Sequence, residues 1–161
     1  MIKPFKSFAL FSALAGAAVL LGPAAGRTAA PDAVRVFENS GAAVIENSAV
    51  RVEFDLGRGT YRAIDRRTNT AVVEEAFASV GVMDGRAAGQ RRTWSERAVE
   101  DALGRGRTLA LTGATPGYPA ILLEITLYEG RSAIVLGLGL DNTTGYTVRV
   151  CRLQPLEARA F

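Results

Sequence analysis

Histidine is absent from this 161-residue chain, and cysteine occurs once, at Cys151. Without histidine the protein lacks the commonest general base, the commonest metal ligand and the usual partner of a catalytic serine. A single cysteine forms no intramolecular disulfide and supports no metal cluster. We therefore expect no metal and no cofactor. We interpret Cys151 as a buried or half-buried apolar residue of a strand rather than as a reactive thiol.

Lysine is also scarce, because it occurs only at Lys3 and Lys6. The formal net charge is +3, and without Lys3, Lys6 and Arg27 the remaining 16 basic residues face 16 acidic ones. This balance leaves no sustained basic field to attract a phosphate backbone. A nucleic-acid partner is not expected.

The N-terminal segment has the three regions of a secretory signal peptide. Lys3 and Lys6 precede an apolar run over 8–21, and small residues follow up to Gly26. We predict a signal helix over 1–26 that is cleaved near Gly26, which places the mature protein in the periplasm or the medium. A retained anchor is the alternative, but the run is shorter than the ~20 residues of a spanning helix. In that case the chain contacts the membrane only through the transient signal peptide.

The rest of the chain alternates in the manner of β-strands. In 49–55, Val50, Val52 and Phe54 fall on one face, and charged residues fall on the other. Similar runs rich in Val, Ile, Leu and Thr are separated by Gly, Asn, Asp and Pro, which favour turns. We assign 27–42 to an N-terminal extension with a first strand and 43–161 to one β-sandwich domain.

The alternation around Cys151 predicts a strand over 147–156, after a turn at 141–145. The segment 96–103 is ambiguous, because its residue spacing also suits two helical turns. About ten strands result, and an antiparallel two-sheet β-sandwich is their natural closure, so the predicted fold class is all-β.

No catalytic residues stand out. Glycoside hydrolysis needs two carboxylates that face each other across the sugar bond, and the spacing of the acidic residues singles out no pair. The candidates are Glu53, Asp55, Asp65, Glu74, Glu75, Glu100, Asp101, Glu124 and Glu129. The sequence Asn142-Thr143-Thr144 fits a glycosylation acceptor, but we favour a turn there.

Three aromatic residues are candidate carbohydrate contacts: Trp94, Tyr118 and Tyr128. Flat aromatic rings suit the apolar faces of sugar rings, and Tyr118 and Tyr128 are expected in or near turns. Packing in the core is the alternative for each of the three.

Several short motifs follow one another in a distinctive order. In chain order they are Ile45-Glu46-Asn47, Val50-Arg51-Val52-Glu53-Phe54, Gly59-Thr60-Tyr61, Ile64-Asp65, Asp101-Ala102-Leu103-Gly104-Arg105-Gly106, Ile125-Thr126-Leu127-Tyr128-Glu129-Gly130 and Asp141-Asn142. Over about 43–156 this order resembles the N-terminal β-sandwich of α-galactosidase-like enzymes, the glycoside hydrolase family 36 or melibiase group. That domain is a supersandwich similar to galactose mutarotase.

The resemblance implies that this chain has a non-catalytic role. In that family the catalytic carboxylates belong to a (β/α)₈ barrel that follows the sandwich, so none can be assigned here. The galactose mutarotases use histidine and glutamate, and this chain has no histidine. We therefore expect a secreted, non-catalytic, carbohydrate-binding β-sandwich that is a fragment of an α-galactosidase-like enzyme. The expected partners of this chain are a galactoside and the missing catalytic barrel.

A second hypothesis belongs to another functional class. A stand-alone periplasmic domain with a structural or protein-interaction role would show the same strands and turns. Binding of a protein partner without binding of sugar would favour it.

Overall fold

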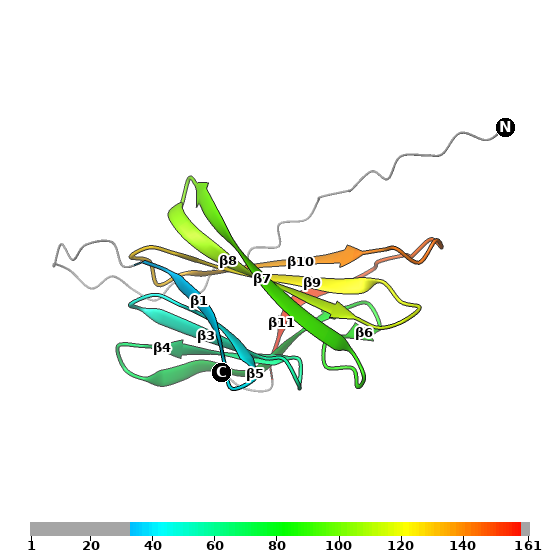
Figure 1. The fold of residues 1–161 in the computed structure, drawn as a ribbon, viewed down its shortest axis with the longest axis horizontal. Helices are drawn as coiled ribbons and strands as arrows, with labels where there is room; N and C mark the ends of the chain where they lie inside the picture. The colour runs from blue at the N-terminus through cyan, green and yellow to red at the C-terminus, as the bar shows by residue number, and fades with distance from the viewer. Residues whose placement is uncertain (1–32, 159–161) are drawn as a thin grey trace.

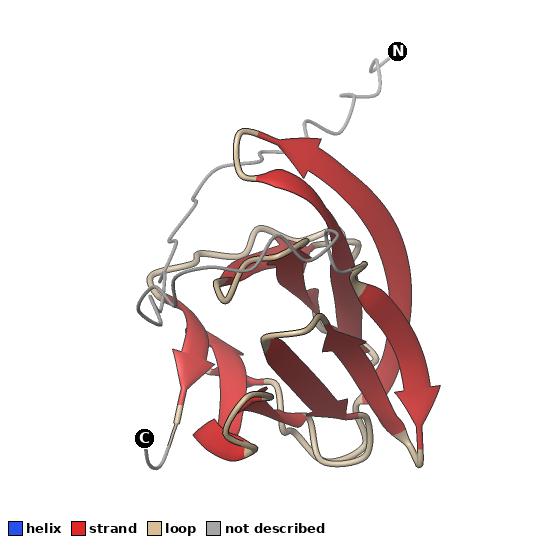
Figure 2. Cartoon of the chain, turned by 90° about the vertical axis from the view of Figure 1, so that its left-hand side faces the viewer, coloured by secondary structure: helices blue, strands red, loops and turns tan. Residues whose placement is uncertain are grey.

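The computed structural model describes residues 33–158, and the predicted signal peptide lies outside them. These residues form strands, turns and loops, and none forms a helix long and apolar enough to cross a membrane (Figure 2). The strands are β1 (Arg35–Asn39), β2 (Ala42–Glu46), β3 (Val50–Asp55), β4 (Thr60–Asp65), β5 (Thr70–Val80), β6 (Met83–Asp84), β7 (Arg91–Asp101), β8 (Gly104–Ala114), β9 (Ala120–Tyr128), β10 (Ile134–Asp141) and β11 (Leu153–Glu157).

The strands form two antiparallel sheets that pack against each other (Figure 1). The larger sheet has the order β1-β2-β3-β4-β5-β11, with the short β6 paired to β5. The smaller sheet has the order β10-β9-β8-β7. The predicted all-β, two-sheet antiparallel sandwich is therefore confirmed.

The core follows from strand alternation on facing sheets. In β3 the side chains of Val50, Val52 and Phe54 are buried, whereas the residues between them are half-buried. On the smaller sheet, Leu109 lies in register with Ile125, and both belong to the same buried cluster. Full burial of each such side chain contributes about 1.5–3 kcal/mol to stability.

The ambiguous segment 96–103 is strand and turn, so its helical interpretation is wrong. Strands β7 and β8 pair in register along their whole length, which satisfies the backbone groups that a helix would pair internally. Glu96 and Arg107 form an ion pair across the two strands, with 2.7 Å between Oε2 and Nη1. Pairing between the strands therefore overrides the local spacing. The tip of this hairpin extends beyond the other strands (Figures 1 and 2).

The predicted strand 147–156 is only partly present. Strand β11 begins at Leu153, and residues 147–152 have no regular secondary structure. The prediction that Cys151 is buried or half-buried is wrong, because the residue is exposed. Its alternating neighbours indicated a strand face, but no strand in the described part of the chain pairs with this segment.

A buried side chain, Asn47, joins the two sheets. Its Oδ1 accepts hydrogen bonds from the backbone N–H groups of Ala49 and Val50, which closes the β2–β3 turn. Its Nδ2 donates to the carbonyl oxygens of Tyr128 (2.9 Å) and Arg131 (2.7 Å), at the β9–β10 turn. Both N–H donors and both acceptor positions of this side-chain amide are thereby used inside the protein.

Candidate functional site

The three candidate carbohydrate contacts differ in how far they are exposed. Tyr128 is buried, with 3% of its surface exposed, and its hydroxyl donates to Asp101 Oδ2 (2.7 Å). Trp94 is half-buried against the core, and its indole N–H donates to Glu38 Oε2 (2.9 Å) across the two sheets. Tyr118 is 61% exposed, in the loop between β8 and β9. Of the three, Tyr118 offers the most accessible ring.

A second exposed tyrosine lies at the same loop. Tyr146 is 50% exposed, and its hydroxyl donates to the carbonyl oxygen of Gly117 (2.8 Å), next to Tyr118. We call Tyr118 and Tyr146 the tyrosine pair. Tyr146 was not predictable from the sequence, because 28 positions separate the two residues and no local pattern links them.

Local turn chemistry places both members of the tyrosine pair. The Tyr118 N–H donates to Thr115 O (3.1 Å), and Gly117 takes a positive φ of 79°, which glycine adopts without strain. On the other side, Asn142 Nδ2 donates to the carbonyl oxygen of Tyr146 (2.8 Å). The predicted turn at Asn142 is thus a bend that its own amide organises.

An exposed carboxylate flanks the tyrosine pair. Asp141 ends β10 and lies in register with Ala120, two residues after Tyr118. It forms no ion pair within residues 33–158. Two flat apolar rings and an acceptor for hydroxyl donors therefore lie at one end of the sandwich.

Other carboxylates are committed to arginines. Burial tends to raise the pKa of Glu53, but hydrogen bonds from Arg62 and Arg51 outweigh it and lower that pKa. Hydrogen bonds from Arg67 and Arg86 likewise lower the pKa values of Asp65 and Asp84. These carboxyl groups stay ionised, which is the opposite of what the general acid of a glycosidase needs.

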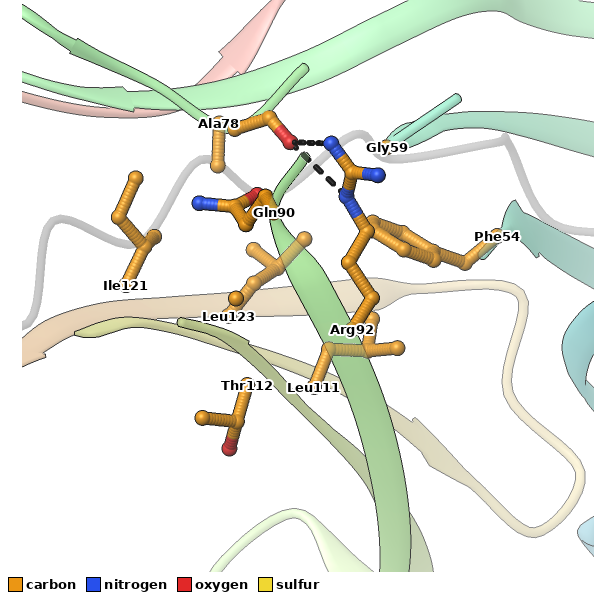
Figure 3. A pocket seen from close by; sticks show the side chains of 11 residues that line it. Phe54, Gly59, Ala78, Gln90, Arg92, Leu111, Thr112, Ile121 and Leu123 are labelled. Atoms are coloured by element: carbon orange, nitrogen blue, oxygen red, sulfur yellow. Dashed lines mark hydrogen bonds between the residues drawn. The ribbon is translucent and has the colours of Figure 1, made fainter. Parts of the chain in front are cut away.

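Two cavities within residues 33–158 are too small for a sugar. One of about 20 Å³ has room for about one water molecule and is lined by Phe54, Leu111 and the stem of Arg92 (Figure 3). Another, of about 40 Å³, lies between β3–β5 and β10 and has an apolar lining. Ligand pockets typically measure about 300–1,000 Å³. In the described region no group of three or more His, Cys, Asp or Glu residues is placed to hold a metal ion.

The raised pKa of the buried residue Tyr128 indicates that the protein loses stability at alkaline pH. Burial, with the hydrogen bond to Asp101, raises its pKa to about 12 from an ordinary value of 10.0. Because the folded state favours the neutral phenol, this contribution is complete below about pH 10 and is lost as the pH rises toward the folded value. We expect urea unfolding to show that the stability of Tyr128→Phe falls less steeply than that of the parent above about pH 10. Parallel pH profiles would contradict this assignment.

Comparisons with known proteins give no relative: no family model, no curated protein and no solved structure matches the chain. The two-sheet sandwich is therefore established by the structure alone, and the finer resemblance to the melibiase group has no independent support.

Proposed function

We propose that the mature chain is a secreted, non-catalytic β-sandwich that binds carbohydrate through the tyrosine pair. The observation that carries this proposal is the placement of Tyr118 and Tyr146 at one end of the sandwich, joined through Gly117. A tyrosine ring presents an apolar face and a polar edge, which suits the mixed surface of a sugar. The order of the sequence motifs supports an α-galactoside as the ligand and an α-galactosidase-like enzyme as the parent protein.

The geometry favours binding at the surface rather than turnover. The hydrogen bond from the Tyr146 hydroxyl to Gly117 fixes that ring before any ligand arrives, which lowers the entropic cost of binding. Asp141 supplies an acceptor for sugar hydroxyls beside the rings. Both rings remain half or more exposed, so an extended polysaccharide can reach them without opening the core.

Titration of the mature protein with melibiose and with galactomannan tests the proposal. We expect Tyr118→Ala and Tyr146→Ala each to weaken binding about tenfold, equivalent to about 1.4 kcal/mol, measured by calorimetry or affinity electrophoresis. Leu103→Ala is the matched control, because it removes another exposed apolar side chain at the distant tip of the β7–β8 hairpin.

Two results would contradict carbohydrate binding at this site. One is the absence of binding to every galactoside tested by the folded parent protein. The other is equal weakening by Leu103→Ala and by the tyrosine variants. Recovery of a protein partner together with the first result would favour the stand-alone interaction domain.

A further inference from the structure

Residues 147–152 have the sequence of a strand without a partner strand. Their order, Thr-Val-Arg-Val-Cys-Arg, is rich in β-branched residues and alternates in polarity. Figure 1 shows this segment running back from the far end of β10 toward β11. One backbone hydrogen bond, from Gly81 N–H to Arg152 O (2.9 Å), holds its end, and no backbone bond between described residues involves 147–151. We call 147–151 the unpaired segment.

Such a conflict between local preference and structure points to function. Strand-forming residues gain their stability from cross-strand neighbours, and those neighbours are missing here. Natural sequences agree with their folds at most positions, and exceptions concentrate at functional sites. The backbone groups of the unpaired segment have no backbone partner within residues 33–158 and are therefore available for hydrogen bonds to an added strand.

Two exposed apolar residues lie close in sequence to the hydrogen bond that holds the end of this segment. Val150 is 43% exposed, and Val82, in the turn that follows Gly81, is fully exposed. Because Gly81 is hydrogen bonded to Arg152, this turn lies directly beside the end of the unpaired segment. Apolar groups that cluster at one surface mark contact sites more often than single exposed residues do.

The charge of this surface selects the kind of partner. Arg149 and Arg152 form no ion pair with any described residue, and the segment after Asp141 carries no acidic residue until Glu157. Pairing of two copies through this segment would bring arginines toward arginines, which disfavours self-association. An acidic partner strand would instead be attracted by both Arg149 and Arg152.

We propose that the unpaired segment binds an extended, acidic stretch of a partner protein as an added β-strand. Backbone hydrogen bonds to 147–151 supply affinity, as in other cases of strand addition. Apolar side chains of the partner cover Val150 and Val82. Carboxylates three residues apart meet Arg149 and Arg152, which point to opposite faces of an extended strand.

This surface differs from the carbohydrate site. It uses Val82, Arg149 and Val150 rather than the rings of the tyrosine pair, and it does not depend on the proposed sugar binding. Tyr118→Ala is expected to leave binding of an acidic strand unchanged, and Arg149→Glu to leave binding of a galactoside unchanged.

A pair of synthetic peptides tests the proposal on the mature protein. The first alternates valine and threonine over ten positions and carries two glutamates three residues apart, and the second has lysines in place of the glutamates. We expect the acidic peptide to bind at least about tenfold more tightly, measured by fluorescence anisotropy. When it is saturating, amide exchange over 147–151 and alkylation of Cys151 slow together.

Charge reversal supplies the decisive comparison. The double variant Arg149→Glu, Arg152→Glu is expected to reverse the preference, so that the lysine peptide binds more tightly. Arg91→Glu is the matched control, because Arg91 is exposed, forms no ion pair in the described region and lies on the edge strand β7. Equal binding of both peptides, an unchanged preference in the double variant, or exchange protection confined to other strands would overturn the proposal.

Discussion

Asn47→Asp is expected to lower the free energy of unfolding by about 3–5 kcal/mol, a large share of the stability of a typical domain. The new carboxylate keeps the two bonds from the Ala49 and Val50 N–H groups. Its other oxygen then faces the carbonyl oxygens of Tyr128 and Arg131, where the amide nitrogen had donated. A buried negative charge beside two acceptors is strongly unfavourable.

The effect of Asn47→Asp depends on pH in a fixed direction. Burial and the two carbonyls raise the folded pKa of the new carboxyl above its unfolded value of about 3.9. Because the folded state then prefers the protonated acid, which can donate one hydrogen bond, the variant is least destabilised below about pH 4. The loss grows as the pH rises through the folded value. Urea unfolding across this range measures it.

Asn142→Asp is the matched control for this prediction. Asn142 also bonds to nearby backbone through both ends of its amide, but it is exposed at the end of β10. We expect a change within about 0.5 kcal/mol there. A loss below about 1 kcal/mol for Asn47→Asp, with no dependence on pH, would contradict the role assigned to Asn47.

Arg92→Met is expected to cost about 3 kcal/mol, because one guanidinium joins two loop segments, the β3–β4 turn and the β6–β7 loop, at the end of the sandwich. Its Nε and Nη2 donate to Gly85 O (3.1 and 2.8 Å), and its Nη1 donates to Gly57 O (2.9 Å). Longer bonds reach the carbonyl oxygens of Leu56 and Ala87. Removal of the guanidinium leaves four carbonyl groups without this donor.

Arg92→Lys distinguishes loss of charge from loss of geometry. The ammonium group keeps the charge, but its three donors radiate from one nitrogen and do not reproduce the planar fork of arginine. We expect it to recover about 1 kcal/mol of the loss. Arg91→Met is the control. The Arg91 side chain is next to Arg92 in the sequence but is exposed, and the expected change lies within about 0.5 kcal/mol. Equal stability of the Arg91 and Arg92 variants, measured by urea unfolding, would refute the role of Arg92.

The fold was predictable where its cause is local. The alternation of Val50, Val52 and Phe54 predicts a strand with one buried face, and β3 has that pattern. The segment 96–103 was not predictable in the same way, because its spacing suited a helix and its ladder depends on β8. In the segment 147–152 the opposite occurs: the pattern indicates a strand, and no partner strand is supplied by residues 33–158.

The candidate site was predictable only in part. Tyr118 is predictable from its place near a turn, but Trp94 and Tyr128 are equally good candidates in the sequence, because the residue type of an aromatic side chain does not tell whether it is exposed or buried. Tyr146 gained its significance from a hydrogen bond to Gly117 across the fold. Exposure and pairing at this distance depend on how loops pack, which leaves no periodic signal in the sequence.

By itself the sequence determined that the described chain is built of antiparallel strands, because side-chain alternation and turn residues act over a few neighbouring positions. Only the tertiary structure decided which polar groups meet. Asn47 bonds to the β9–β10 turn, Arg92 to the β3–β4 turn, and Tyr146 to Gly117, in each case across a long stretch of chain. Packing of the two sheets sets these contacts, and it also leaves the tyrosine pair and the unpaired segment exposed.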